Sequence, residues 1–305
     1  MLVYLTKRVF SEIRRFFFNR VVRQIVNTPP IKIVDAPLRI VSQIRQADIY
    51  SYLLAIKSLY RFLGQGRVIA IVDGDISPAS RTTLETHVPG IKIVPLSAID
   101  VGRCQTGGTW ERLLFILDCA KETYTIQMDS DILTVAPLPE LLDCYRNNRS
   151  FAMAQAGVTQ REAFNEVARI SNMNQWSHVT WVAQRTFADV PEAASLQYIR
   201  GSSGFSGFAA GQVMSRGQVE MFSDTMTTLI GKKWNEWGSE QLMSNVVVGN
   251  SPDSLVLPLP EYTCFEPAEY SIVDKIKCFH FIGTYRFSTH HYRTLARKVI
   301  KELKA

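Results

Sequence analysis

The sequence predicts an α/β fold with a Rossmann-like, mostly parallel sheet flanked by helices in a single domain. Three observations predict it: strand and helix patterns alternate along the chain, the strands are short apolar runs, and polar residues follow the strand ends. The chain has 305 residues, of which 46% are hydrophobic and 20% are charged. That composition is ordinary for a globular protein with a substantial core, in one large or two small domains.

The alternating elements follow one another from residue 38 onward. They are a strand at 38–44, a helix at 48–63, a strand at 67–72, a helix at 77–87, a strand at 91–94, a helix at 110–120 and a strand at 124–128. Gly64 marks the end of the first helix and Ser77-Pro78 the beginning of the second, because these residue types favour helix ends and starts. Strands joined through helices pair in parallel, so the pattern favours a parallel sheet.

The first 30 residues form a basic amphipathic segment. Residues 2–17, wound as a helix, divide into an apolar arc and a polar arc. The apolar arc holds Leu2, Leu5, Val9, Phe10, Ile13, Phe16 and Phe17, and the polar arc holds Lys7, Arg8, Ser11, Arg14 and Arg15. Such a helix suits either an anionic membrane surface or packing on the domain with its charges in solvent. Pro29-Pro30 then breaks the chain, so we expect a helical segment at 1–30 and the main domain at 31–305.

The charge and the cysteines limit the partners and the compartment. The net charge of +6 and the pI of about 9.1 indicate an anionic partner, but the excess lies near the N-terminus, which argues against nucleic acid. The five cysteines form no CxxC pair, as expected of free thiols in a reducing compartment. No apolar run has the length of a membrane span, and Lys7 and Arg8 interrupt any signal peptide. The sequence predicts a cytoplasmic protein, with peripheral attachment to the inner face of the cell membrane as a further option.

Two carboxylates come directly after the predicted strand at 124–128. Asp129 and Asp131 are separated only by Ser130, and such a pair suits a hard divalent cation that also binds phosphate oxygens. His280, far downstream, can complete the ligand shell of this Mn²⁺ or Mg²⁺ ion. The alternatives are a solvated acidic turn and a core histidine between Phe279 and Phe281.

Polar residues follow two more strands, at Ser42-Gln43 and at Asp73-Gly74-Asp75. Open α/β sheets bind ligands beyond the carboxyl ends of their strands, so this edge predicts a nucleotide site. Residues 151–200 differ in composition, and we expect them to form an insertion beside the site. Trp176 and Trp181 in that insertion either stack on a sugar ring or form a buried cluster.

Four motifs occur in a characteristic order along the chain. The Asp129-Ser130-Asp131 motif continues into the aliphatic stretch and helix of residues 132–142. The later motifs are Phe208-Ala209-Ala210-Gly211, Glu240-Gln241-Leu242-Met243-Ser244-Asn245 and His280-Phe281-Ile282-Gly283-Thr284-Tyr285-Arg286-Phe287. This order resembles the nucleotide-sugar glycosyltransferases of the GT-A fold, and most closely family 8, the group of glycogenin and bacterial lipopolysaccharide galactosyltransferases. The chain departs from that family at Ala209, Glu240 and Arg286, where the family has asparagine, aspartate and lysine.

The resemblance implies a role for each motif. Asp129, Asp131 and His280 would hold Mn²⁺ or Mg²⁺ on the donor diphosphate. Contacts with the nucleotide-sugar would come from Val41, Ser42, Asp73, Arg112, Ser130, Gly283 and Arg286. Glu240 and Gln241 would lie at the catalytic centre, and Ala210, Trp176 and Trp181 would bind the acceptor.

The function implied is a metal-dependent glycosyltransferase. It would move a hexose from a nucleotide-diphosphate donor, with a UDP-sugar and retention of configuration favoured, to a glycan or lipid-linked acceptor in bacterial surface polysaccharide synthesis. One alternative is a membrane-surface adaptor with a degenerate site, which Ala209 suggests. Another is a haloacid dehalogenase-type phosphatase, but Leu133 occupies its Thr/Val position. Sugar nucleotidyltransferases have a glycine-rich loop after the first strand, which Val41–Ile44 lacks.

Overall fold

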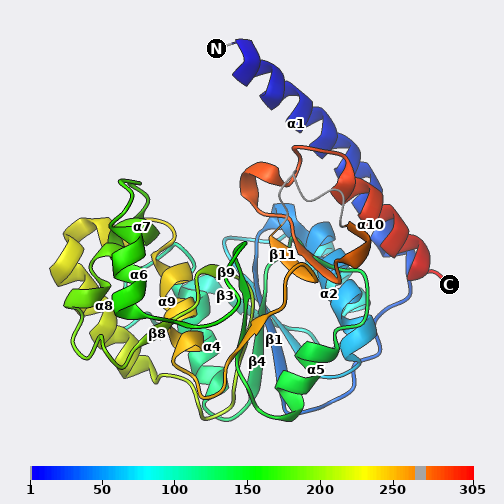
Figure 1. Ribbon diagram of the computed structural model, residues 1–305. Helices are drawn as coiled ribbons and strands as arrows, with labels where there is room; N and C mark the ends of the chain where they lie inside the picture. The colour runs from blue at the N-terminus through cyan, green and yellow to red at the C-terminus, as the bar shows by residue number, and fades with distance from the viewer. Residues whose placement is uncertain (1, 265–272) are drawn as a thin grey trace. The chain divides into compact units, whose positions relative to one another are not determined.

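The computed structural model describes residues 2–264 and 273–305, and it describes side chains from Arg8 onward except that of Thr284. The chain divides into two compact units. The first comprises Met1–Val94, Met128–Pro139 and Leu259–Ala305, and the second comprises Pro95–Gln127 and Glu140–Pro258. Figure 1 shows the helices and strands of both.

The main sheet has seven strands in the order β10-β6-β9-β4-β1-β2-β3. These strands are β1 (Leu38–Ile44), β2 (Arg67–Val72), β3 (Lys92–Pro95), β4 (Tyr124–Met128), β6 (Phe151–Ala154), β9 (Gly201–Phe208) and β10 (Leu255–Leu257). β1 pairs with β2 in parallel, as β10 does with β6, whereas β6 and β9 are antiparallel. The predicted α/β fold with a mostly parallel sheet is confirmed.

The first unit carries the helices α1 (Leu2–Val22), α2 (Ile49–Leu63), α3 (Pro78–His87) and α10 (His291–Glu302). It also carries a three-stranded sheet in the order β11 (Tyr262–Cys264), β12 (Cys278–His280) and β5 (Ile132–Thr134). Eleven of the fifteen residues of α2 are buried, and the helix ends at Gly64 in the left-handed conformation, as predicted. The small sheet was not predicted, because its strands are only three residues long.

The segment after α1 is tied to the first unit by a buried lysine. The ammonium of Lys57 donates to the hydroxyl of Thr28 at 2.8 Å and to the carbonyl of Pro29 at 2.7 Å. Ile31 N donates to the carbonyl of His87 at 3.1 Å. Burial lowers the pKa of Lys57 to about 8. The division of the chain at residue 30 stays a prediction.

Helix α1 extends five residues beyond the predicted end and lies beside α10 (Figure 1). Its last part packs: the buried ring of Phe18 stacks on Tyr292 with centroids 4.2 Å apart, and Arg14 donates to the carbonyl of Ser288 at 2.6 Å. Elsewhere the helix is open, since Val9, Phe10, Ile13, Phe16 and Phe17 are 46–59% exposed. The side chains of Leu2, Leu5 and Lys7, which belong to the predicted arcs, lie outside the described residues. One part of the helix therefore packs on the unit, and another presents apolar side chains to solvent.

None of the described helices combines the length and the apolar content that crossing a membrane requires.

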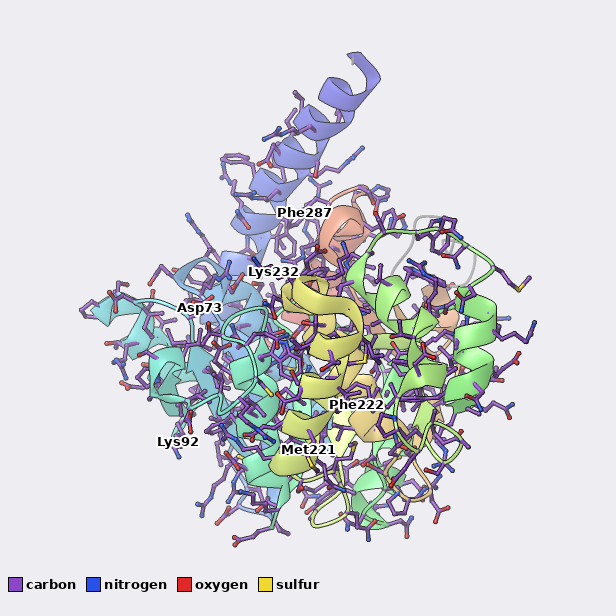
Figure 2. All side chains as sticks on the ribbon, turned by 90° about the vertical axis from the view of Figure 1, so that its left-hand side faces the viewer. Asp73, Lys92, Met221, Phe222, Lys232 and Phe287 are labelled. Carbon is purple, nitrogen blue, oxygen red and sulfur yellow. The ribbon has the colours of Figure 1, made fainter. Side chains whose placement is uncertain are left out.

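The second unit contains the helices α4 (Trp110–Ala120), α5 (Pro139–Arg146), α6 (Phe164–Ser171), α7 (Val179–Arg185), α8 (Arg216–Ile230) and α9 (Ser239–Gly249), and the strand pair β7 (Glu162–Ala163) and β8 (Gln197–Tyr198). Helix α8 has a buried and an exposed face. On α8, Phe222 is buried, whereas its neighbour Met221 is 57% exposed (Figure 2). The stretch expected to be an insertion, 151–200, begins with β6, which is a strand of the main sheet.

Strand β9 was not predicted because six of its eight residues, in the sequence Gly-Ser-Ser-Gly-Phe-Ser-Gly-Phe, are glycine or serine and only the two phenylalanines are typical of strands. Close packing explains the glycines at both ends. A Cβ on Gly207 would lie 2.3 Å from the ring of Phe151, and one on Gly201 would lie 2.2 Å from the carbonyl oxygen of Met153. Both neighbours belong to β6, the partner strand, so these glycines allow the two strands to approach.

The packing of α1 can be tested with two phenylalanines two positions apart. We expect Phe18→Ala to lower the free energy of unfolding by about 3 kcal/mol, because it removes a buried ring from the contact with Tyr292. Phe16→Ala is the matched control, because Phe16 is 59% exposed and its loss leaves the contact intact. Urea unfolding of both variants and of the wild type measures the difference. Equal stability of the two variants would contradict the packing of α1.

Candidate active site

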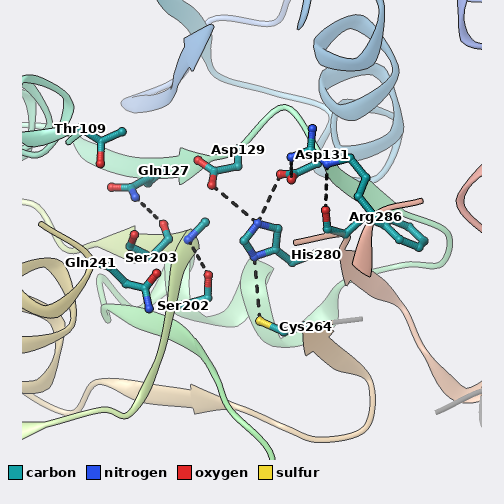
Figure 3. Close-up of polar contacts among 12 residues, drawn as sticks. Thr109, Gln127, Asp129, Asp131, Ser202, Ser203, Gln241, Cys264, His280 and Arg286 are labelled. Carbon is teal, nitrogen blue, oxygen red and sulfur yellow. Dashed lines mark hydrogen bonds and ion pairs between the residues drawn. The ribbon is translucent and has the colours of Figure 1, made fainter. Parts of the chain in front are cut away.

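Two carboxylates and one imidazole converge in the first unit (Figure 3). Asp129 and Asp131 follow β4, and His280 ends β12. In the antiparallel pairing of β12 with β5, His280 lies opposite Ile132, and Phe281 N donates to the carbonyl of Asp131 at 3.1 Å. The imidazole Nε2 therefore lies 3.6 Å from Asp129 Oδ2 and 3.3 Å from Asp131 Oδ1.

This cluster fits a divalent metal ion. The ligand atoms of its three residues all lie within 4.8 Å of one another, and Asp131 and His280 are buried while Asp129 is half-buried. Two carboxylates and an imidazole suit Mn²⁺ or Mg²⁺, with the remaining positions left to water or phosphate oxygens. The side chain of His280 faces the two carboxylates. The rings of Phe279 and Phe281 stack on each other, with their centroids 5.4 Å apart. The structure therefore brings together the three residues predicted to bind the metal.

Two further side chains hold this cluster. The guanidinium of Arg286 donates through Nη2 to Asp131 Oδ2, and through Nε to the carbonyl of Phe281 at 3.1 Å. Cys264 Sγ lies 3.9 Å from His280 Nδ1 on the other side of the imidazole (Figure 3). Arg286 was predicted to contact phosphate, and that role stays a prediction. Cys264 was not predicted, because only the pairing of β11 with β12 brings it opposite His280.

The electrostatics of the cluster favour ionised side chains. Burial opposes the charge of Asp131, but the neighbouring charges of His280 and Arg286 outweigh it and lower the pKa of this carboxyl. Burial likewise opposes protonation of His280, but the Asp131 carboxylate outweighs it and raises the pKa of the imidazole well above its usual value. Burial raises the pKa of Asp48, and the charges of Arg286 and Asp131 interact electrostatically with this carboxyl. The imidazolium proton and a metal ion therefore compete for the same carboxylates.

The predicted nucleotide residues of the first unit differ in how accessible they are. Asp73 lies at the end of β2, where its N–H donates to the carbonyl of Ile44 at 2.9 Å and its carboxylate accepts from Arg45 Nε at 2.7 Å. Val41 and Ser42 are buried in β1. Ser130 is half-buried between the two aspartates, and an added Cβ on Gly283 would meet no atom within 4 Å. Their contacts with a nucleotide-sugar stay predictions.

In the second unit, Glu240 is held by a buried network. Its Oε2 lies 3.5 Å from Arg112 Nη2, with both side chains at most 4% exposed. The hydroxyls of Thr109 and Ser203 donate to the same oxygen at 2.7 and 3.4 Å. Arg112 was predicted to contact phosphate, and in this structure its guanidinium faces Glu240. Thr109 and Ser203 were not predicted, because no motif marks them.

Gln241 and Asn245 tie α9 to β9. Their amides donate to the carbonyl of Gly201 at 3.1 and 2.9 Å. Ala210 N donates to Asn148 Oδ1 at 2.7 Å, and the amide of Asn148 donates back to Ala210 O at 2.9 Å. These contacts fix the backbone around the predicted catalytic and acceptor residues, whose roles stay predictions.

Aromatic side chains are exposed on the second unit. Trp176 is 59% exposed, and its ring lies 4.4 Å from that of the half-buried Trp181 at an angle of 85°. Trp237 is 70% exposed, with its ring 6.0 Å from that of His178. The exposure of Trp176 does not fit the predicted buried cluster, and the contact of these rings with a sugar stays a prediction.

Several solved structures resemble this chain, although no family model and no curated protein matches it. The bifunctional glycosyltransferase WbbM is 15% identical, with a TM-score of 0.47, over 88% of this chain and 51% of that chain, so this chain spans about half the length of WbbM. The galactosyltransferase LgtC, in complex with donor and acceptor sugar analogues, is 10% identical, with a TM-score of 0.48, over 88% of this chain and 96% of that chain. The mannosyltransferase Ktr4p from S. cerevisiae is 8% identical, with a TM-score of 0.45, over 97% of this chain and 93% of that chain.

The chain is similar in fold to GT-A glycosyltransferases. The resemblance predicted from the four motifs is confirmed at this level. At identities of 8–15% the similarity concerns the fold alone. The chemistry of this chain is therefore argued from its own residues.

The competition between the proton and the metal predicts a pH dependence. We expect Mn²⁺ to bind more tightly as the pH rises through the neutral range towards the raised pKa of His280, by up to about tenfold per unit, because His280 must lose its proton to become a ligand. Titration calorimetry in buffers of different ionisation enthalpy should detect the release of about one proton. His280→Gln should bind more weakly and with a flatter pH profile. A wild-type affinity that does not change between pH 6.5 and 8 would contradict this role of His280.

Proposed function

We propose that this chain is a metal-dependent glycosyltransferase that transfers a hexose from a nucleotide-diphosphate donor. The observation that carries the proposal is the Asp129–Asp131–His280 cluster at the carboxyl end of β4. The carboxyl edge of an α/β sheet is where nucleotides bind, and a cluster of two carboxylates and an imidazole suits a cation that carries phosphate. A UDP-sugar is the donor that we favour.

The cluster supplies the features that a diphosphate donor needs. A bound Mn²⁺ or Mg²⁺ ion would neutralise the charge that develops on the departing diphosphate. Asp131 Oδ1 and Asp129 face His280, whereas Asp131 Oδ2 is held by Arg286, so the guanidinium fixes the orientation of one ligand. Gly283 has no neighbour within 4 Å of an added Cβ and leaves room beside this edge. The assigned roles are metal binding for the cluster, and donor binding for Asp73, Ser130, Gly283 and Arg286.

The surroundings of Glu240 favour retention of configuration. An inverting enzyme needs a carboxylate that takes a proton from the acceptor hydroxyl. Glu240 is buried and already engaged by Arg112 and two hydroxyls, so it is poorly placed for that task. We infer that Glu240 and Gln241 position neighbouring groups, and that no base at residue 240 drives the reaction.

The acceptor that we propose is a glycan or a lipid-linked sugar, in the synthesis of bacterial surface polysaccharide. Exposed Trp176, with Trp181 behind it, offers a face for stacking on a sugar ring. Peripheral attachment to the cytoplasmic face of the membrane would suit a lipid-linked acceptor. A screen of nucleotide-sugars for hydrolysis and for thermal stabilisation, with and without Mn²⁺, tests the donor.

Substitution of the metal ligands tests the proposal directly. We expect Asp131→Asn to lower Mn²⁺-dependent binding of a nucleoside diphosphate and sugar transfer on the order of a hundredfold or more, and His280→Ala to weaken both less. Asp143→Asn, in the exposed pair with Arg149, is the control for the loss of one carboxylate. Binding is measured by calorimetry and transfer by release of the nucleoside diphosphate. Stability is measured separately, because Asp131 also holds Arg286.

Two results would separate the alternatives. Binding of nucleoside diphosphate with Mn²⁺ but without turnover of any donor would favour the adaptor. Wild-type transfer by Asp131→Asn would remove the metal from the mechanism.

The inference of retention predicts the configuration of the product. With a donor whose anomeric bond is α, we expect an α-linked product, because no accessible base at residue 240 activates the acceptor for single displacement. Proton NMR of the first product formed measures the anomeric coupling. A β-linked product would contradict the inference and would require another carboxylate as the base.

A further inference from the structure

A pocket of about 250 Å³ lies between α1 and α10 in the first unit, and none of the candidate metal ligands lines it. Its lining residues are Phe17, Arg20, Val21, Gln24, Arg293 and Arg297. Three guanidinium groups thus converge on one small hollow at the junction of two helices. None of these residues belongs to the motifs that predicted the glycosyltransferase site.

Among the described residues, no acidic side chain pairs with the arginines of this pocket. The acidic residues of the two helices are Glu12 and Glu302, which pair with Arg15 at 3.5 Å and with Arg61 at 2.7 Å. Within the described residues, the guanidinium groups of Arg20, Arg293 and Arg297 make no hydrogen bond and no ion pair. Nε of Arg293 is buried without a hydrogen-bond partner, and its guanidinium lies 5.6 Å from the centre of the Phe17 ring. Three cations that face one hollow favour an anion, and guanidinium groups match phosphate oxygens in geometry.

The exposed apolar row of α1 leads directly into this pocket. At about 100° per residue, Val9, Phe10, Ile13, Phe16 and Phe17 fall within an arc of about 120°. Arg20, one turn further on, falls within the same arc, and Gln24 lies in the 3₁₀ helix that follows α1 (Arg23–Asn27). Phe18 lies on the opposite side, where it packs on Tyr292. One face of the helix therefore presents a row of exposed apolar side chains, and the arginine-lined pocket follows this row.

We propose that this pocket binds the phosphate of an anionic lipid headgroup while the row from Val9 to Phe17 enters the membrane surface. A soluble phosphate would use the arginines but would leave five apolar side chains in water. An anionic lipid can contact the arginines through its phosphate and the apolar side chains through its hydrocarbon chains. The proposal is independent of the glycosyltransferase chemistry, because it uses no residue of that site.

Vesicle co-sedimentation of the full-length chain tests the proposal, with phosphatidylcholine vesicles that contain or lack phosphatidylglycerol. We expect binding only to the anionic vesicles. The pocket variant Arg20→Gln/Arg293→Gln/Arg297→Gln should bind them on the order of a hundredfold more weakly. The apolar variant Phe10→Ser/Phe16→Ser should lose at least about tenfold.

A charge-matched control separates a site from general attraction. Lys32→Gln/Lys92→Gln/Lys232→Gln removes the same charge from three exposed lysines outside α1 and α10 (Lys92 and Lys232 in Figure 2), and should lower binding by less than about threefold. Equal losses in the pocket and control variants would overturn the pocket. Circular dichroism verifies folding, and the single variant Arg297→Gln, at an exposed position, replaces the triple variant if that fails to fold.

Glycerol phosphate, added at constant ionic strength, distinguishes a lipid from a soluble ligand. We expect millimolar glycerol phosphate to leave vesicle binding nearly unchanged. If it stabilises the wild type but not the pocket variant, and Phe10→Ser/Phe16→Ser sediments like the wild type, the ligand is a soluble phosphate and the lipid proposal is wrong. Failure of the wild type to bind anionic vesicles would also overturn it.

Discussion

The antiparallel pairing of β5 with β12 is the constraint on which the candidate site depends. Asp131 stands immediately before β5, and His280 is the last residue of β12. The register that places His280 opposite Ile132 brings residues about 150 positions apart in the chain within 3.3 Å of each other. Because side chains alternate between the two faces of a strand, a slip of one residue would turn the imidazole away from the carboxylates. The short sheet thus sets the geometry of the candidate metal site.

Buried charge is balanced locally in both units. In the first unit, Asp131 lies between His280 and Arg286, so its burial does not leave an uncompensated carboxylate. In the second unit, Glu240 and Arg112 compensate each other, and two hydroxyls add hydrogen bonds. In the first unit, a carboxylate oxygen of Asp131 faces the imidazole of His280, and this arrangement allows a metal ion to replace the imidazolium proton. The second has both charged groups enclosed, which suits a structural or positioning role.

Helix α1 has two faces with different tasks. Phe18 packs on Tyr292 and holds the helix against α10, whereas Phe16 and Phe17, which directly precede it, face outward. A fold that needed only packing would not place five large apolar side chains of one helix in solvent. Their continuity with the arginine pocket links hydrophobic and electrostatic recognition on a single surface. The basic residues near the N-terminus thus share one pocket with Arg293 and Arg297 of α10.

The sequence by itself determined the alternation of strands and helices and the strand that carries Asp129 and Asp131, because both are patterns of neighbouring residues. His280 was predicted as their partner from the order of the motifs along the chain and from the ligands that such a metal ion prefers. It missed β9, whose Gly201 and Gly207 reflect close strand packing and not β-propensity. Only the tertiary structure decided that Arg286 faces Asp131, that Arg112 is enclosed with Glu240, and that Cys264 lies beside the imidazole. Those contacts join residues between 16 and 155 positions apart, and strand register and helix packing, which set them, depend on the whole chain.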